Sequence, residues 1–400
     1  MGEKNTGSSN SPRLRTLYLH IPFCRRICPF CAFAVRKENP LRHQEYLSAV
    51  LDEARLRKQE TAQALEPLDS IYFGGGTPSR LSVAELSQLL EGLHSIFAIA
   101  PEVEIAFEVN PEDLTDAYSV ALRQLGVNRV SLGGQSFNDT TLKTLGRQHT
   151  GTQLKQALTS LKTAGIRNWN LDLIFGVPGQ TLEAFASDLE AALSFAPPHL
   201  SLYGLEVHEG TPFARRPEVL SWEEAHSELF ASQYLHAIEQ LSQSALRQYE
   251  VSNFAAPGWE GRQNLRVWDG EGYLGLGVGA HSFWARRRWG NVRSLHAYQK
   301  RLREGKAPEA FFEELSPTQL ANEVLMLQLR RPSGLNLQRW AEAFSVEEGL
   351  AEGLKWLERW KASGWAREGT VGQLALTPEG LLRADAITAV LLQEEPTPAE

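Results

Sequence analysis

The sequence contains little cysteine, no long apolar run and no excess of positive charge, and each shortage excludes a class of protein. Three cysteines in 400 residues, all within residues 24–31, do not make a disulfide scaffold. No apolar stretch approaches the roughly 18 residues of a membrane span. Lys and Arg number 40 against 48 Asp and Glu, and this net charge of −8 disfavours nucleic-acid binding, which needs clustered cations. With a polar first segment, "MGEKNTGSSNSPR", that lacks the apolar core of a signal peptide, the composition predicts a cytoplasmic protein with reduced thiols.

Short β-rich runs alternate with amphipathic helical patterns in the first half of the chain. We predict strands at residues 17–21, 69–75, 103–110, 129–135, 168–176 and 199–205. Apolar residues recur at helical spacing between them, and Ser82 with Glu85 is typical of a capping box. Such alternation predicts an α/β fold with a parallel sheet and crossover helices. Six units favour a TIM-like barrel, or an open partial barrel, over a short doubly wound sheet.

The pattern changes after about residue 215, and the chain is predicted to contain a second, smaller unit. A helix is expected near residues 221–244, followed by the glycine-rich "GYLGLGVGAHSFW". From residue 316, helical segments precede a hairpin-like stretch and another helix, an order that indicates a small α+β, winged-helix-like module. The predicted organisation is a disordered N-terminus (1–13), a barrel (14–250), a connecting segment (251–315), the winged-helix-like domain (316–392) and a tail (393–400).

The three cysteines have the spacing C-x3-C-x2-C, at Cys24, Cys28 and Cys31. A structural zinc site needs four protein ligands, and no distant histidine is marked as the fourth. Iron–sulfur clusters also usually take four cysteines, and a four-iron cluster held by three leaves one iron open. This motif, with Phe30 before the third cysteine, resembles the radical S-adenosylmethionine (SAM) superfamily, in which that iron binds SAM. The resemblance implies a [4Fe-4S] cluster and SAM, with zinc or three incidental thiols as the alternatives.

Polar residues follow the predicted strands at their carboxyl ends, where barrel enzymes gather their sites. "GGGTP" (residues 74–78) follows the second strand; read alone it could be a tight turn. Glu108, Gln135 and Asp172 end or lie in later strands, and Arg147 follows in "LGRQHT". Alone, each acid is as often a structural ion pair as a ligand. Together they predict a polar cradle for one zwitterionic molecule, with the carboxylates on its ammonium and hydroxyl groups and Arg147 on its carboxylate.

The order of motifs over residues 14–285 resembles the coproporphyrinogen-III-oxidase-like group of radical SAM proteins. The motifs are "YLHIPFCRRICPFCAF", "YFGGGTPSRL", "FEVNPEDL", "RVSLGGQSFND", "LGRQHT", "NLDLIFGVPGQT", "LSLYGLEVHEGTPF", "YEVSNFA" and "GLGVGAHS". By this resemblance the SAM-contacting positions are Tyr18, Phe30, Gly75, Gly76, Thr77, Glu108, Gln135, Arg147 and Asp172. The resemblance assigns no catalytic residue.

The group has two branches, a HemW-type heme chaperone and an oxygen-independent coproporphyrinogen III dehydrogenase. Three features favour the chaperone, which hands heme to an acceptor protein. Phe33 stands where the dehydrogenase typically has another cysteine, only about 16 residues precede Leu17, and the dehydrogenase chain is usually longer. The dehydrogenase remains the enzymatic alternative. A nucleic-acid-directed radical SAM protein is the second alternative, disfavoured by the acidic charge.

One segment departs from the pattern of the chaperone branch, and the departure concerns heme binding. Chaperone members commonly carry His-Asn-x-x-Tyr-Trp, and here Gln263 replaces the histidine while Asn264 and Trp268 remain. Glutamine does not serve as a strong axial ligand to heme iron, as histidine does. His281 is a conceivable substitute, although a hydrogen-bonded loop histidine is the more common role for such a residue. His20 is expected either to contact SAM or to orient the cysteine loop.

Overall fold

The computed structural model describes residues 13–369 and 372–394. The predicted disordered N-terminus and C-terminal tail fall almost wholly outside these ranges. None of the helices within them has the length and apolarity that crossing a bilayer requires.

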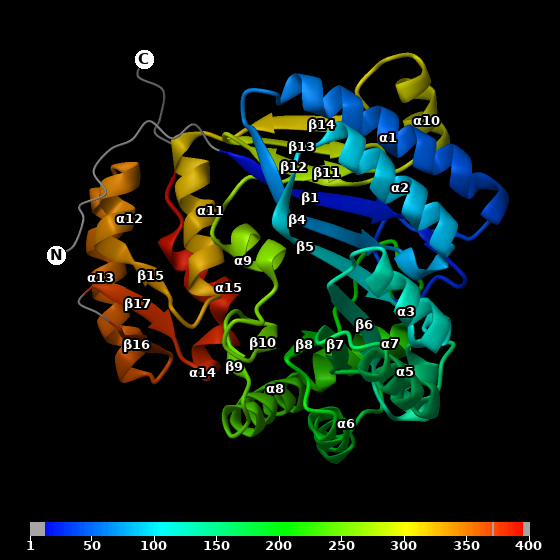
Figure 1. The fold of residues 1–400 in the computed structure, drawn as a ribbon. Coiled ribbons are helices and arrows are strands. Elements are labelled where there is room, and N and C mark those ends of the chain that lie inside the picture. The colour runs from blue at the N-terminus through cyan, green and yellow to red at the C-terminus, as the bar shows by residue number, and fades with distance from the viewer. Residues whose placement is uncertain (1–12, 370–371, 395–400) are drawn as a thin grey trace.

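A nine-stranded, mostly parallel sheet forms the centre of the molecule (Figure 1). Its strands are β1 (Leu14–Ile21), β4 (Leu65–Gly75), β5 (Ile99–Val109), β6 (Arg129–Gln135), β7 (Asn168–Phe175), β8 (His199–Gly204), β9 (Arg247–Gln248), β10 (Asn253–Ala255) and β11 (Leu274–Leu276). Their order is β11-β1-β4-β5-β6-β7-β8-β10-β9, parallel from β11 to β8 and antiparallel at β10 and β9. The six strands predicted from the sequence are confirmed as the parallel core, and the α/β partial barrel is confirmed with them.

The strands alternate between an apolar outer face and a polar inner face, because successive side chains point to opposite sides of a sheet. In β7, Trp169, Leu171 and Leu173 are buried toward the helices. Asn170 and Asp172 point the other way and lie in register with polar residues of the neighbouring strands. The inner face of the sheet therefore carries the candidate functional residues.

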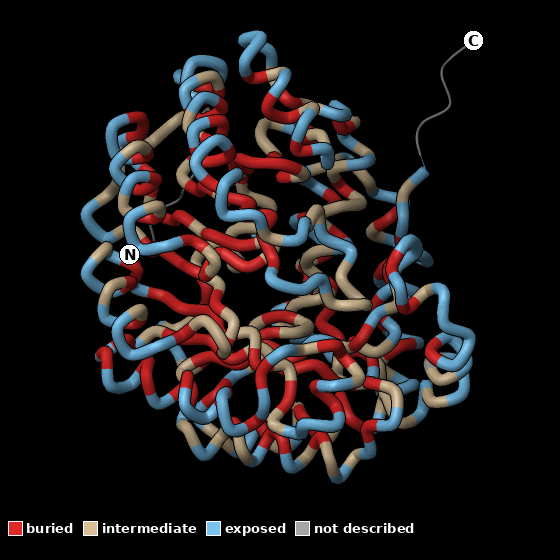
Figure 2. Tube along the Cα trace, turned by 90° about the vertical axis from the view of Figure 1, so that its right-hand side faces the viewer, coloured by how far each residue is buried: buried red, intermediate tan, exposed pale blue. Residues whose placement is uncertain are grey.

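Helices cover the outer face of the sheet (Figure 1). The helices of this part of the chain are α1 (His43–Glu60), α2 (Val83–Ile96), α3 (Asp116–Gln124), α4 (Asp139–Thr144), α5 (Gly151–Thr163), α6 (Leu182–Ser194), α7 (Pro217–Ala225) and α8 (Ser227–Ser242), with short 3-10 turns η1 (Pro40–Arg42), η2 (Pro78–Arg80), η3 (Pro111–Asp113) and η4 (Phe213–Arg215). Of these, α7 packs at the carboxyl ends of the strands, where its Val219 joins the cluster around Ile174. The predicted capping box at Ser82 and Glu85 is present at the start of α2. Figure 2 shows the strands in red, as buried, and the outward turns of the helices in blue, as exposed.

The predicted helix at residues 221–244 is divided in two. His226 has φ −122° and ψ 25°, outside the helical region, so α7 ends there and α8 begins directly afterwards. The sequence offers no proline or glycine at this position to signal the break.

The C-terminal part adds two small antiparallel sheets and further helices. One sheet is β12 (His281–Trp284), β13 (Arg287–Asn291) and β14 (Glu309–Glu314); the other is β15 (Leu335–Asn336), β17 (Gln373–Leu376) and β16 (Ala366–Glu368). The helices are α9 (Arg262–Trp268), α10 (Leu295–Arg303), α11 (Pro317–Leu329), α12 (Leu337–Phe344), α13 (Glu347–Ala362), α14 (Pro378–Leu381) and α15 (Ala384–Leu391). The α+β unit has the order predicted from the sequence, in which helices precede a hairpin and further helices follow it. The domain limits at residues 250 and 315 stay predictions, and β10 and β11 join the large sheet beyond residue 250.

Candidate cofactor site

A pocket of about 660 Å³ opens at the carboxyl ends of the parallel strands. It is lined by all but one of the residues that the resemblance marks as cluster or SAM positions: Cys24, Cys28, Phe30, Cys31, Gly75, Gly76, Thr77, Glu108, Gln135, Arg147 and Asp172. Tyr18 is the exception. Its ring stacks behind Tyr72 at a centroid distance of 6.1 Å, and Tyr72 lines the pocket in its place.

The cysteines lie on a loop that leaves β1 and returns beside it. The loop is closed by a short parallel pair, β2 (Phe23–Cys24) and β3 (Arg36–Lys37), and by a hydrogen bond from Glu38 N to Cys24 O of 2.8 Å. Within it, Cys31 N donates to Cys28 O at 3.1 Å. These backbone bonds hold the three thiols at the mouth of one pocket.

Two side chains donate hydrogen bonds to the sulfur atoms. Thr77 Oγ1 lies 3.5 Å from Cys24 Sγ, and Arg147 Nη1 lies 3.6 Å from Cys28 Sγ. Burial raises the pKa of the Cys24 thiol to about 11, and the Thr77 hydrogen bond opposes this rise. Burial also raises the pKa of Cys31. A thiolate here therefore needs a strong electrophile, which an iron–sulfur cluster supplies, together with donors of the kind that Thr77 and Arg147 provide.

The thiols fit a four-iron cluster better than a single metal ion. Among the described residues, no three His, Cys, Asp or Glu side chains converge on one ion position. A zinc site requires such convergence. A four-iron cluster does not, because each thiolate binds a different iron. The arrangement therefore does not support the zinc alternative.

His20 orients the cysteine loop. Its Nε2 lies 3.0 Å from the carbonyl oxygen of Ala34, at the end of the loop, and its Nδ1 lies 3.1 Å from the Tyr18 hydroxyl. Since a carbonyl only accepts, Nε2 carries the proton and Nδ1 accepts from Tyr18. Burial lowers the pKa of His20 to about 4, so the ring is neutral at pH 7. Of the two roles expected for His20, the contacts support the orienting one.

The glycine turn after β4 brings backbone close to the pocket. Gly75 has φ +107°, and a Cβ there would lie 2.3 Å from His20 Nδ1. At Gly76 a Cβ would lie 2.7 Å from Ile21 O. Only glycine fits these positions, and the turn leaves the Gly75 N–H free to donate to Glu108 Oε2 at 3.1 Å.

Two buried carboxylates face the pocket from the inner side of the sheet. Glu108 accepts from the Tyr72 hydroxyl at 2.9 Å, and burial raises its pKa to about 7. Asp172 accepts from Asn170 Nδ2 at 2.6 Å and from Ser131 Oγ at 3.1 Å. Burial raises the pKa of Asp172 as well, although these hydrogen bonds oppose the rise. A cationic ligand would stabilise the charged forms of both carboxylates and so lower their pKa values.

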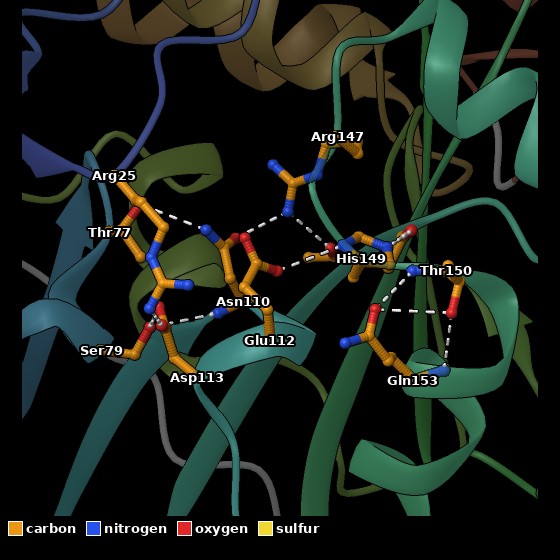
Figure 3. A network of polar contacts seen from close by, with 12 residues as sticks. Arg25, Thr77, Ser79, Asn110, Glu112, Asp113, Arg147, His149, Thr150 and Gln153 are labelled. Carbon is orange, nitrogen blue, oxygen red and sulfur yellow. Dashed lines mark hydrogen bonds and ion pairs between the residues drawn. The ribbon is translucent and has the colours of Figure 1, made fainter.

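Arg147 also lines the pocket, where a network of polar contacts holds it in place (Figure 3). Its Nη2 donates to Asn110 Oδ1 at 2.7 Å and to Gly133 O at 2.9 Å. Next to it, His149 donates from Nε2 to Gly134 O at 2.9 Å and lies 3.3 Å from Glu112 Oε2. The network holds one cation in the same pocket as the two carboxylates, as a zwitterionic ligand needs.

Unsatisfied polar atoms around the pocket also fit a bound ligand. Within the described part of the chain, Gln135 Oε1 and Arg147 Nε are buried without a hydrogen-bond partner. Gln135 also has φ +63°, a strained conformation for a residue other than glycine. Buried polar atoms are rarely left unpaired, so the residues present fit SAM as their missing partner.

A second polar network, which was not predicted from the sequence, lines the same pocket. His199 Nδ1 donates to Asn170 Oδ1 at 2.7 Å, and His199 Nε2 accepts from the Tyr249 hydroxyl at 2.8 Å. Asn264 Nδ2 donates to that same hydroxyl at 3.0 Å. The signal available in "HLSLYG" was the period-two polar pattern of residues 199, 201 and 203, which turns these side chains toward the pocket.

Of the residues considered as heme ligands, only Gln263 lines this pocket. Its Oε1 is buried and has no partner among the described residues. His281 is exposed on β12 and is absent from the pocket lining. The structure therefore gives no support to His281 as a replacement within this pocket.

The chain is similar to known proteins along almost its whole length. The radical SAM superfamily matches residues 18–192. The heme chaperone HemW of Synechocystis sp. is 33% identical, over 97% of this chain and 98% of that protein. The HemW of Mycobacterium tuberculosis is 34% identical over 94% of both chains. Among solved structures, the coproporphyrinogen III oxidase HemN from Escherichia coli superposes with a TM-score of 0.80 over 96% of this chain and 90% of that one; at 23% identity this shows a common fold.

Proposed function

The chain belongs to the HemW heme chaperone family of radical SAM proteins, and from this membership we propose that it binds heme and delivers it to an acceptor protein. The observation that carries the proposal is the 33% identity to a heme chaperone over 97% of the chain. Membership in the radical SAM superfamily implies a [4Fe-4S] cluster and SAM as cofactors.

The cofactor pocket offers each cofactor suitable groups. Cys24, Cys28 and Cys31 would hold the cluster, with Arg147 and Thr77 donating to the sulfur atoms. Glu108, Asp172 and the Gly75–Gly76 turn would hold SAM. Bound together, the cluster and SAM supply one-electron chemistry. The chain's own residues position and shield them.

The dehydrogenase alternative has less support from the site. Phe33, at the position where a further cysteine is typical of that branch, lies at the pocket with 67% of its surface exposed. The likeness to HemN carries the fold alone. If the protein is not a dehydrogenase, it should release no carbon dioxide from coproporphyrinogen III under reducing, anaerobic conditions with SAM.

A hemin titration of the anaerobically reconstituted, cluster-loaded protein tests the proposal. We expect a saturable change in the Soret absorbance at one heme per chain, followed by heme transfer to the apo-form of a heme protein. Free thiolates also bind heme iron, so the control is the triple variant Cys24→Ala, Cys28→Ala, Cys31→Ala. This variant should lose its iron–sulfur cluster and still bind hemin. Absence of saturable binding by the cluster-loaded protein would refute the chaperone role.

A further inference from the structure

A second pocket, of about 600 Å³, lies beside the cofactor pocket and shares Leu205 and Glu206 with it. Its walls come from the segments that follow β7 and β8, from α7 and α8, and from the C-terminal end of α14. They are mostly apolar and include Pro178, Leu205, Val219, Leu229, Phe230 and Leu382. Its volume is in the range that holds a cofactor-sized ligand.

Phe230 forms part of this wall and covers the ends of two strands. A Cβ at Gly176 would lie 2.7 Å from its ring, and one at Gly204 would lie 2.3 Å from it. The glycines let the ring lie flat against the ends of β7 and β8. The pocket thus has a rigid apolar wall at the same edge of the sheet as the cofactor site.

His226 lines this pocket at the junction of α7 and α8. Its Nδ1 lies 2.9 Å from the carbonyl oxygen of Trp222, so Nδ1 carries the proton and Nε2 keeps its lone pair. Nothing in the described part of the chain hydrogen-bonds Nε2. The Trp222 ring stacks on the imidazole with a centroid distance of 3.6 Å and an interplanar angle of 11°, which holds the ring in place.

We propose that this pocket binds heme, with His226 Nε2 as the axial ligand to the iron. A histidine that ligates a metal nearly always donates its other ring N–H to a carbonyl or carboxylate, as His226 does to Trp222. Heme also needs an apolar slot for its macrocycle, which the walls supply. The inference rests on the proposed function and supplies the ligand that Gln263 does not.

One cation lines this pocket and would be available to a heme propionate. Arg383, an exposed residue at the rim of the pocket, donates from Nη1 to Glu379 O at 2.9 Å and lies over the Trp365 ring at 4.8 Å. A guanidinium has five N–H donors, so others remain for a carboxylate. Glu206 and Glu379 at the same rim disfavour a ligand that is anionic along its whole length. The pocket, with a cation at its rim and apolar walls, matches heme, which has carboxylates at one edge and an apolar macrocycle.

Other histidines near the two pockets are less suited to bind the iron. His199 uses both ring nitrogens in hydrogen bonds. His208 lies 3.5 Å from Glu206 through its Nε2 and lines only the cofactor pocket. His281 lines neither pocket. His226 alone among these combines an apolar pocket with an oriented, unshared Nε2.

The test is a hemin titration of cluster-loaded His226→Ala protein beside the wild type, with His94→Ala as the control, because His94 is an exposed histidine of α2 that lines neither pocket. We expect His226→Ala to bind hemin at least tenfold more weakly and to lose the spectrum of histidine-ligated heme. Free imidazole should restore that spectrum in the variant, because it fills the space of the deleted ring. His94→Ala should titrate like the wild type. Unchanged affinity and spectrum in His226→Ala would overturn the assignment.

A second variant tests the pocket without removing His226. Leu229→Trp would fill the apolar slot and leave the histidine in place, so it should also weaken hemin binding. SAM binding and the cluster absorbance should match the wild type in both variants. Wild-type hemin affinity in Leu229→Trp would count against this pocket. If the wild-type protein itself binds no hemin, the proposed function fails; if it binds hemin and His226→Ala binds equally well, only this inference fails.

Discussion

Glu108 should make SAM binding depend on pH. Burial raises the pKa of this carboxyl to about 7, so in the ligand-free protein it is mostly protonated at lower pH. An ammonium ligand favours the carboxylate, and binding must then release a proton. We expect the affinity for SAM to fall by up to about tenfold per pH unit below about pH 7. Calorimetry in two buffers of different ionisation enthalpy would measure the proton release directly.

The variant Glu108→Gln provides the control for that titration. Glutamine has nearly the same shape but no charge to gain, so its SAM affinity should be weaker and nearly independent of pH in this range. A wild-type affinity that stays flat between about pH 6 and 8 would contradict the role of Glu108.

At the residue scale, the sequence could indicate which side chains share the pocket but not how they are partnered. Cys24, Glu108 and Asp172 lie at one edge because the carboxyl ends of parallel strands meet there. The His199–Tyr249 hydrogen bond joins residues 50 apart in the sequence. Its formation depends on β10 returning antiparallel beside β8, which no local pattern signals. Roles in binding remain predictions for each of these residues.

At the element scale, the glycine turn after β4 should be far less tolerant of a side chain than other turns. Gly75 has φ +107°, and a Cβ there would lie 2.3 Å from His20 Nδ1. Gly75→Ala therefore adds a steric clash to the backbone strain. We expect it to lower the free energy of unfolding by about 2–4 kcal/mol in urea titrations, and to weaken SAM binding as the turn shifts.

Gly179→Ala is the matched control. Gly179 has φ +82°, and a Cβ at this position would meet nothing within 4 Å, so its substitution carries the backbone strain without the clash. It should cost only about 1 kcal/mol. Equal costs for the two substitutions would show that the contact with His20 does not constrain the turn.

Long elements were predictable and short ones were not. The six parallel strands were found because each carries buried apolar residues at alternate positions over several residues. β11 is only Leu274–Leu276, within a glycine-rich run, so its sequence carries little strand pattern. The break between α7 and α8 was missed because His226 leaves the helical region without a glycine or proline. In both places tertiary contacts decide the conformation.

At the scale of the whole molecule, the chain after residue 250 completes the structure that the first half begins. β11 pairs with β1, which makes β1 an interior strand of the sheet. The C-terminal α14 region contributes Leu382 and Arg383 to the second pocket. The cofactor pocket likewise takes Gln263 and Asn264 from α9. Both pockets therefore require parts of the chain that are far apart in sequence.

Glu53 shows how strongly the first half of the chain depends on residues 251–315, which pack back against it. The carboxylate lies on α1 with no exposed surface. It accepts from Gly277 N at 2.8 Å, from Asn291 Nδ2 at 2.7 Å and from Tyr298 Oη at 2.6 Å. All three donors lie between residues 251 and 315. Without them the carboxylate would keep only its ion pair with Arg57 on the same helix, whose Nε lies 3.6 Å from Glu53 Oε1. Burying a carboxylate that has lost its hydrogen bonds costs several kcal/mol.

A fragment of residues 1–250 should consequently fail to fold as a monomer, whereas one of residues 1–315 should fold. The shorter fragment leaves Glu53 without its donors and exposes the edge of β1, including the apolar Leu17 and Leu19, and such edges promote aggregation. The longer fragment keeps β11 and all three donors. Size-exclusion chromatography and thermal unfolding followed by circular dichroism would compare the two. A monomeric 1–250 fragment that unfolds as cooperatively as 1–315 would show that the barrel stands alone at residue 250, and that the return of the chain serves only to build the two pockets.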